Sequence, residues 1–518
     1  MLVRVLFLLI LISTNAIASE FYIGKEKKSL CNKNVVFNSK TDSIEVEVLN
    51  HRKWIESLLK LIIEFNQPTT KTSDEGVFNF VINDTYKKYY KSKVKVNYSE
   101  HKIECEFDAK VKITGDGWWH LDWDVGKPFT SIQVKLSDGN INNIVNFKLL
   151  LPKSRAADNE IFIISLMRYL NFLAPRTFYT DAKINGVNRK YIFQEDLSKE
   201  LLESYSLVEG PIIEGDERFT IERKFKGKNF PPFSISRVSN HKYIKGDLPK
   251  MNKSLEAISL MNKIYIQSHL SFPNSIEKLN INSQIENGLF TEDFNTYESL
   301  IYAMNADHGQ SHDDRRFYYD PINNYFLPIY YDGKPKILNH KKNKLSGKKN
   351  LDHITNLLKN SVSQEAVEGS HKAIQLIKNI ENEKVLTIIN QNGLKMTKKE
   401  FSNLKNIIIS RLEIIKNIQP KKVKFKILNS YFEKFQSEKD FVNLVFANEN
   451  QIEICNIDLS NCQKKTIDYE NVRYLYAQNF NFLKTEKDEI FLFIGKSKNY
   501  HENIKEAKFV RHKIAKNF

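Results

Sequence analysis

The sequence contains little cysteine, and the spacing of its cysteines excludes the usual structural zinc sites. Its 518 residues include four cysteines, Cys31, Cys105, Cys455 and Cys462. No two of them are close enough to form a zinc knuckle. An even number in an exported chain is compatible with disulfides, and we prefer local pairing of the first two and of the last two. Free buried thiols explain the first two equally well.

Beyond its first residues the sequence also lacks an apolar run long enough to cross a bilayer, so no transmembrane anchor is expected. Residues 1–18 have Arg4 as their only charge, followed by the short apolar run LFLLILI and the small residues of Ala16-Ile17-Ala18. This pattern is typical of a secretory signal peptide that is cleaved after Ala18. No cysteine follows directly, so a lipid anchor is not indicated. We expect an exported protein, periplasmic or extracellular.

None of the usual nucleic-acid-binding motifs is present. The chain has a net charge of +16, but its lysines are spread along the whole length. The densest basic run, HKKNKLSGKKN at 340–350, resembles a loop. We therefore interpret the charge as a solvated basic surface and expect no nucleic-acid partner, with a different anionic partner as the alternative.

Short alternating segments and amphipathic stretches predict an α+β protein. Residues 19–106 form an N-terminal region in which WIESLLKLIIEF reads as an amphipathic helix with Trp54, Leu58, Leu59, Ile62 and Ile63 on its apolar side. The core is expected at 107–340, with an insertion at 220–292. A helical extension follows at 341–420, with helices at roughly 368–382, 384–392 and 398–417. Short strands predict a β-rich module at 421–518.

Acidic side chains are concentrated in the stretch Asn305–Gly333. Its segments FYYDP and YFLPIYYDG predict two strands joined by an Asp-Pro…Asn-Asn turn. Such a hairpin would bring Asp313 and Asp314 near Asp332, with Asp307 a few residues upstream. Carboxylates gathered in this way repel each other unless a cation lies among them, and Mg²⁺ is the usual one. Solvated turn residues are the alternative.

Histidines in the same stretch are a weaker indication of metal. His308 and His312 are four residues apart, with Asp313 next. Gly309 argues against a helix there, and the HExxH pattern is absent. Polar histidines near a functional loop are therefore preferred over a zinc site.

A second candidate site lies where the strand AKVKI breaks at Thr114-Gly115-Asp116-Gly117 and resumes as SIQVKL, which carries Lys135. Glycines let a backbone approach phosphates, and a lysine adds a point charge. The same connection carries Trp118, Trp119 and Trp123. We interpret the tryptophans as a small aromatic core under a loop, in preference to a ligand platform.

The order of these parts resembles that of a protein kinase: a Gly turn, a lysine strand, a helix with an early glutamate, a hairpin, and an Asp-bearing loop before a second Asp. The motifs HRD, DFG and APE are absent. The chain resembles the kinase-like family of the spore-coat protein CotH over about 107–335. The segments that carry the resemblance are VKITGD…SIQVKL, FKLLLPKSRAADNEIF…LNFLAPRT, INGVNRKYIFQEDLSKELLE…EGPIIEGDE and ADHGQSHDDRRFYYD…FLPIYYDG.

The resemblance implies an atypical two-lobed kinase-like core that uses ATP with Mg²⁺ or Mn²⁺. It implies the following roles: Gly115, Gly117 and Lys135 at the phosphates, Glu160 as the partner of Lys135, Gln194 and Glu195 as the adenine-side connector, Asp307 at the acceptor hydroxyl, and Asp314 and Asp332 as metal ligands. Asp313 is an alternative to either loop aspartate, because Asp307 and Asp314 are further apart than the kinase pattern has them. Glu160 also suits the first turn of its helix for structural reasons.

Two functions follow from the resemblance, and a third from the carboxylates alone. The first is an exported atypical kinase that transfers a phosphoryl group to a protein hydroxyl. The second is a catalytically inactive kinase-like scaffold that binds or assembles an envelope or coat protein. A metal-dependent hydrolase ranks last, because no nucleophile is identified. In the first two cases the expected partner is a secreted or envelope protein.

Overall fold

The fold is known from a computed structural model of the chain. The structure describes residues 41–338 and 362–419 with interruptions, the longest at 67–81 and 272–288, together with Cys31 and five strands between 442 and 496. The expected signal peptide at 1–18 and the lysine-rich run at 340–350 lie outside the described residues. Among the helices that are described, none is long and apolar enough to span a membrane.

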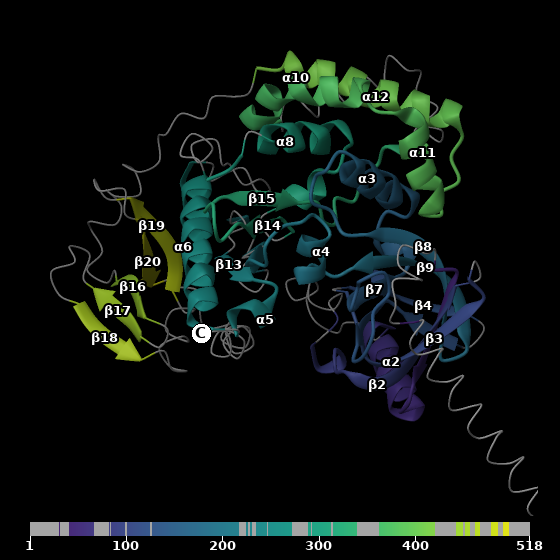
Figure 1. The fold of residues 1–518 in the computed structure, drawn as a ribbon. Helices are drawn as coiled ribbons and strands as arrows, with labels where there is room; N and C mark the ends of the chain where they lie inside the picture. The colour runs from purple at the N-terminus through teal and green to yellow at the C-terminus, as the bar shows by residue number, and fades with distance from the viewer. Residues whose placement is uncertain are drawn as a thin grey trace, which may run out of the picture.

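A closed barrel of seven strands occupies the first half of the chain, in the order β1-β2-β3-β6-β7-β9-β8 (Figure 1). All neighbours are antiparallel except β1 and β8, whose parallel pairing closes the barrel. Alternate residues point inward, such as Val94, Val111 and Val134, which are fully buried. The strands are β1 (Ser43–Val48), β2 (Tyr90–Tyr98), β3 (Ile103–Ile113), β6 (Ile132–Leu136), β7 (Asn146–Leu150), β8 (Thr177–Ile184) and β9 (Val187–Glu195).

The barrel joins two regions that the sequence analysis separated. The boundary expected between residues 106 and 107 falls inside β3, and the strands on both sides of it belong to one barrel. Helix α2 (His51–Asn66) packs on it through Trp54, Leu58 and Leu61. The helix is confirmed, but Ile63, assigned to its apolar side, is 57% exposed. The predicted Cys31–Cys105 disulfide is also confirmed.

A four-stranded sheet in the order β13-β10-β14-β15 forms the second half of the core. Its strands are β10 (Ile212–Asp216), β13 (Ile235–Val238), β14 (Arg316–Tyr319) and β15 (Phe326–Ile329). Helix α6 (Leu248–Ser271) contributes Ala257, Met261 and Ile264 to the apolar cluster on this sheet. Strand β13 and helix α6, which both lie within the insertion expected over 220–292, are therefore packed as part of this sheet.

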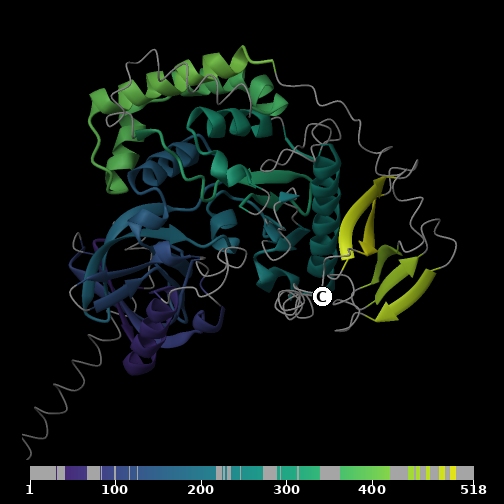
Figure 2. The same ribbon diagram turned by 180° about the vertical axis from the view of Figure 1, so that it is seen from behind.

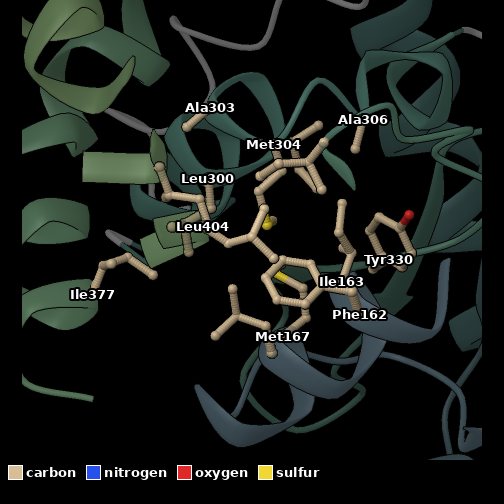
Figure 3. Packing of buried hydrophobic residues seen from close by; sticks show 14 of the residues in the cluster. Phe162, Ile163, Met167, Leu300, Ala303, Met304, Ala306, Tyr330, Ile377 and Leu404 are labelled. Carbon is tan, nitrogen blue, oxygen red and sulfur yellow. The ribbon is translucent and has the colours of Figure 1, made fainter. Parts of the chain in front are cut away.

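A layer of helices covers the barrel end and the four-stranded sheet, and Figure 1 shows it along the top of the molecule. The helices are α3 (Asp158–Tyr169), α8 (Asp293–Ala303), α10 (Gln364–Lys378), α11 (Asn382–Gln391) and α12 (Lys398–Lys416). Their apolar faces meet in the largest core, where Phe162, Met167, Leu300 and Leu404 converge near the buried ring of Tyr330 (Figure 3). The helices expected at 368–382, 384–392 and 398–417 are thus present, with the first starting four residues earlier.

A five-stranded sheet in the order β18-β17-β16-β20-β19 lies beside α6, on the side away from the barrel (Figure 2). Its strands are β16 (Val442–Asn448), β17 (Gln451–Cys455), β18 (Cys462–Thr466), β19 (Gln478–Lys484) and β20 (Ile490–Lys496). The register places Cys455 opposite Cys462 in the backbone ladder. The chain as a whole is α+β, as the sequence predicted, and its closed barrel was not predicted.

Candidate functional site

The acidic stretch folds as the sequence predicted. Strands β14 and β15 pair as a hairpin, and Asp320 accepts backbone hydrogen bonds from Ile322 and Asn323 to close its turn. The turn η8 (Asp307–Gln310) lies directly against the segment that follows β15, since a Cβ on Gly309 would be 2.7 Å from the Tyr331 carbonyl oxygen. Close packing of these two segments brings the upstream aspartates to Asp332.

Three side chains form a candidate metal centre at this point. The ligand atoms of His308, Asp314 and Asp332 all lie within 4.8 Å of one another. The His308 Nε2 is 3.1 Å from the Asp314 Oδ2, which also accepts a hydrogen bond from the Ser311 hydroxyl at 3.0 Å. The buried Oδ1 of Asp332 has no hydrogen-bond partner among the described residues. An unsatisfied carboxylate oxygen beside a second carboxylate and an imidazole fits a divalent cation, with oxygen donors suited to Mg²⁺ or Mn²⁺.

Arg155 holds the other oxygen of Asp332. Its Nη1 pairs with the Asp332 Oδ2, and both side chains are largely buried, at 7% and 14% exposure. Burial alone would raise the pKa of Asp332, but the Arg155 guanidinium outweighs burial, so the pKa lies below its ordinary value. Two residues with positive φ, Ala156 and Ala157, follow Arg155 and lead into α3. This strained turn, rather than a regular element, directs the guanidinium inward.

Lys148, on β7, is the second cation of the site. Its Nζ lies 3.4 Å from the Asp196 Oδ1 and donates to the Tyr331 hydroxyl at 3.1 Å. Burial lowers the pKa of Lys148, but Tyr331 and Asp196 outweigh burial and raise it overall. The Nη2 of Arg155 donates to the same Tyr331 hydroxyl at 2.7 Å. A single neutral oxygen thus lies between two cations, a position suited to a phosphate oxygen.

Glu160 lies in the first turn of α3 and is fully buried. It accepts a hydrogen bond from the Tyr330 hydroxyl at 2.9 Å. Burial raises its pKa from 4.5 to about 7, although Arg155 opposes the shift. A carboxyl group with such a pKa is close to half-ionised at neutral pH, so its charge depends on what binds nearby.

Lys135 does not pair with Glu160, which corrects the expected ion pair. Burial lowers its pKa, and the charges that act on it, those of Lys242 and Lys110, lower it further. The strand directly before α3 is β7, and its lysine is Lys148. Sequence reasoning therefore missed Lys148 and Arg155, although both lie in the quoted segment FKLLLPKSR. The available signal was the position of Lys148 on the last strand before the helix that carries Glu160.

The Gly turn does not present an open backbone. A Cβ on Gly115 would lie 2.1 Å from the His120 ring, and one on Gly117 would lie 2.4 Å from the Trp119 ring. The glycines therefore make room for the rings of their own loop. Trp118 and Trp123 are 51% and 48% exposed, so the expected aromatic core under a loop is wrong. Trp123 lies on β4 (Leu121–Asp124), which pairs with β5 (Lys127–Thr130).

The expected connector residues have mainly structural contacts. Glu195 forms a two-point ion pair with Arg176, with Nε–Oε2 at 2.9 Å and Nη2–Oε1 at 2.5 Å. Gln194 is fully buried beside Glu160. Asp196, one residue further on, is the residue that reaches the site through Lys148. Asp307 opens the turn η8 and is partly buried, and Asp313 and His312 lie outside the described residues.

Comparison with known proteins adds no family assignment. No family model matches the chain, and no curated protein matches it. The geometry of this site is therefore what supports a function.

Proposed function

We propose that the protein is an exported kinase-like phosphotransferase of the CotH type that transfers a phosphoryl group from ATP to a protein hydroxyl. The observation that carries the proposal is the meeting of Lys148 and Arg155 with Asp314 and Asp332 in one site. Cations for phosphate oxygens and carboxylates for a divalent metal are the two requirements of phosphoryl transfer.

The order of the elements supports the same proposal. A lysine strand (β7) precedes a helix with an early glutamate (α3), two strands and a connector, and the chain then returns through α8 to an Asp-bearing turn and a hairpin that ends at Asp332. Kinases arrange their lysine, αC glutamate, catalytic loop and metal-binding Asp in this order. In this proposal the barrel takes the part of the smaller lobe, and the four-stranded sheet with its helices takes the part of the larger one.

The proposed roles follow from position. Lys148 and Arg155 donate to phosphate oxygens, replacing their present bonds to the Tyr331 hydroxyl. Asp314 and Asp332, with His308, would hold Mg²⁺ or Mn²⁺, which would neutralise charge on the phosphates. Asp307 orients the acceptor hydroxyl and accepts its proton. The hydroxyl oxygen forms a bond to the terminal phosphorus as the bond from that phosphorus to the bridging oxygen of the nucleoside diphosphate breaks.

The test uses the mature chain, residues 19–518, in thermal-shift titrations with ATP, with and without Mg²⁺ or Mn²⁺, and in labelled-phosphate transfer assays. ATP at 100 times its dissociation constant should stabilise the chain by about 2.7 kcal/mol. We expect Asp332→Asn to lose both the shift and transfer, and Asp307→Asn to lose transfer and keep the shift. The exposed Asp181→Asn, on β8, is the matched control. Transfer that persists in both site variants would refute the mechanism.

A second candidate is a scaffold of the same fold that binds an envelope or coat partner without turnover. The observation that favours it is that the site's charged groups are already paired. Arg155 forms an ion pair with Asp332, and the Tyr331 hydroxyl accepts hydrogen bonds from both Lys148 and Arg155. The Cys31–Cys105 disulfide suits export, where ATP is scarce. No nucleotide-dependent shift, together with partner capture that survives the double change Asp307→Asn and Asp332→Asn, would favour this function.

A further inference from the structure

The outer faces of β2 and β3 carry complementary charges along part of their length. Lys93 lies opposite Asp108 in the register, with its Nζ 2.8 Å from the Asp108 Oδ1. Lys95 lies opposite Glu106, with Nζ and Oε2 3.7 Å apart. This is the ordinary arrangement of an exposed antiparallel sheet, in which facing charges attract.

The same strands have the opposite arrangement further along. Lys91 on β2 lies opposite Lys110 on β3, and Lys110 lies opposite Lys135 on β6. We call Lys91, Lys110 and Lys135 the lysine row. Val111 and Val134 point into the barrel, so the lysines between and beside them point outward. Adjacent strands are about 5 Å apart, and like charges directly opposite each other are destabilising at this separation.

A fourth lysine acts on the row from the other half of the core. Lys242, on α5 (His241–Ile244), exerts the largest effect of any charge on Lys135. Burial lowers the pKa of Lys135, and the charges of Lys242 and Lys110 lower it further. Within the part of the chain that the structure describes, no carboxylate forms an ion pair with any lysine of the row or with Lys242. We therefore expect repulsion here that the neighbouring lysine–carboxylate pairs avoid.

The lysine row lies next to the candidate site. Gln133 is two residues from Lys135 on the same face of β6, faces Lys148 in the register and donates to the Asp196 Oδ2 at 2.6 Å. Residues two apart on a strand are about 7 Å from each other. The row is therefore one side-chain repeat away from the row that contains Lys148, and it faces the four-stranded half of the core through Lys242.

We propose that Lys110, Lys135 and Lys242 form a second anion-binding site, with Lys91 at its edge, which takes a phosphate group. Ammonium groups that approach one another without a carboxylate are neutralised when a multiply charged oxyanion lies among them. The phosphate comes either from a free anion or from the remote end of a ligand whose first phosphate lies at Lys148. This site goes beyond phosphoryl transfer and does not depend on it.

The experiment is a titration of the mature chain with inorganic pyrophosphate in EDTA at low ionic strength, followed by calorimetry and thermal shift. The test variant is the double change Lys110→Gln and Lys135→Gln. Its control is the double change Lys93→Gln and Lys95→Gln, which removes the same charge from the same barrel face. We expect the test variant to melt higher without anion, by about 1–3 °C, because repulsion is relieved. We expect it to bind pyrophosphate at least ten-fold more weakly, while the control binds as the parent does.

Three results would overturn the site. The first is a test variant that melts lower than the parent, which would mean that the lysines already have a counter-charge. The second is equal pyrophosphate binding by the two double variants, and the third is loss of pyrophosphate binding in Lys148→Gln alone. Adenosine 3′,5′-bisphosphate compared with adenosine 5′-monophosphate identifies the source. If the bisphosphate binds ten-fold more tightly than the monophosphate, and this difference disappears in the test variant, the ligand spans both rows. If the two nucleotides bind equally well while pyrophosphate binding still depends on the lysines, the site takes a free anion. Loss of ATP-dependent transfer in Asp332→Asn leaves these results unchanged, so the two proposals fail separately.

Discussion

Two neighbouring groups of cations in this protein are neutralised in different ways. In the metal end of the site, defined by Lys148, Arg155, Tyr331 and the three candidate ligands, each cation has an internal counter-charge: Asp196 for Lys148 and Asp332 for Arg155. In the lysine row, one repeat away, lysine faces lysine. A ligand at the metal end must displace existing bonds, whereas a ligand at the lysine row only relieves repulsion.

The difference indicates how binding energy would be distributed. At the metal end, the bonds of the Tyr331 hydroxyl to Lys148 and Arg155 must break before a phosphate takes their place, so part of the interaction energy is spent on rearrangement. At the lysine row we expect repulsion between facing lysines to destabilise the free protein, and binding of an anion to remove that effect. A site that costs stability when empty is expected where function requires it.

The largest expected effect comes from breaking the buried ion pair of the metal end. Arg155→Met leaves the Asp332 carboxylate buried without its partner, and we expect a loss of about 3–5 kcal/mol in the free energy of unfolding. The double change Arg155→Met and Asp332→Asn removes both charges and should recover most of that loss. Urea unfolding measures the free energy of unfolding of the parent, of Arg155→Met and of the double variant.

The control for this pair is Arg52→Met, which removes an Arg–Glu pair whose arginine side chain is 90% exposed. We expect no measurable change in its stability. Equal effects of Arg155→Met and Arg52→Met, or no recovery in the double variant, would mean that the pair with Asp332 does not neutralise the metal end.

The next largest effect concerns the pH dependence of stability that the buried Glu160 causes. The pKa of Glu160 is raised to about 7 in the folded chain from an ordinary value of 4.5. The folded state therefore binds a proton that the unfolded state releases, and stability contributed by this group is present below about pH 4.5 and lost as pH rises through 7. At pH 8, Glu160→Gln should be more stable than the parent by on the order of 3 kcal/mol, and at pH 4 the two should agree.

A second buried acid gives the control for this prediction. Glu365, on α10, also has a pKa raised by burial to about 7, so the parent's stability falls with pH through two groups. Guanidinium titrations between pH 4 and 8 give the slope of the free energy of unfolding against pH. Glu160→Gln should remove one part of that slope, and Glu365→Gln should remove the other. Identical slopes in the parent and in Glu160→Gln would show that Glu160 is ionised throughout.

A smaller effect is expected from the hydroxyl that lies between the two cations. Tyr331→Phe keeps the ring that Arg155 and Arg316 cover, at 4.7 and 5.0 Å from its centroid, and removes only the shared acceptor. Because Lys148 and Arg155 keep their carboxylates, we expect a loss of about 1 kcal/mol in stability. ATP should bind several-fold more tightly. Tyr179→Phe, whose hydroxyl bonds to Asp158, is the control, and weaker binding in Tyr331→Phe would mean that the hydroxyl itself contacts the ligand.

The same comparison explains which features could be predicted from the sequence. The β14–β15 hairpin and the gathering of Asp314 with Asp332 depend on neighbours in sequence, and both are confirmed. His308 belongs to no HExxH motif, so the sequence favours a polar role for it over metal binding. It reaches the metal end through the turn η8 instead.

Features that depend on sheet order could not be predicted in this way. Lys135 and Lys148 both lie on short strands that alternate in the same manner, and only the barrel order places Lys148 beside Asp196 and Tyr331. The pairing of β13 with β10 joins residues 213 and 238, so the segment between them resembled an insertion. Arg155 lies in a turn with positive φ at Ala156 and Ala157, where no periodic pattern indicates its direction.

The smallest expected effect compares two single lysines on the barrel face. Lys93→Gln removes exposed ion pairs with Asp108 and Glu106, and Lys110→Gln removes repulsion from Lys91 and Lys135. We expect melting temperatures that change by about 1 °C in opposite directions, down for Lys93→Gln and up for Lys110→Gln. The screening length falls from about 30 Å at 0.01 M salt to about 3 Å at 1 M, so the difference should shrink as salt is added. If both variants shift in the same direction at low salt, the lysine row is neutralised within the protein, and its charges then resemble those of the metal end rather than contrasting with them.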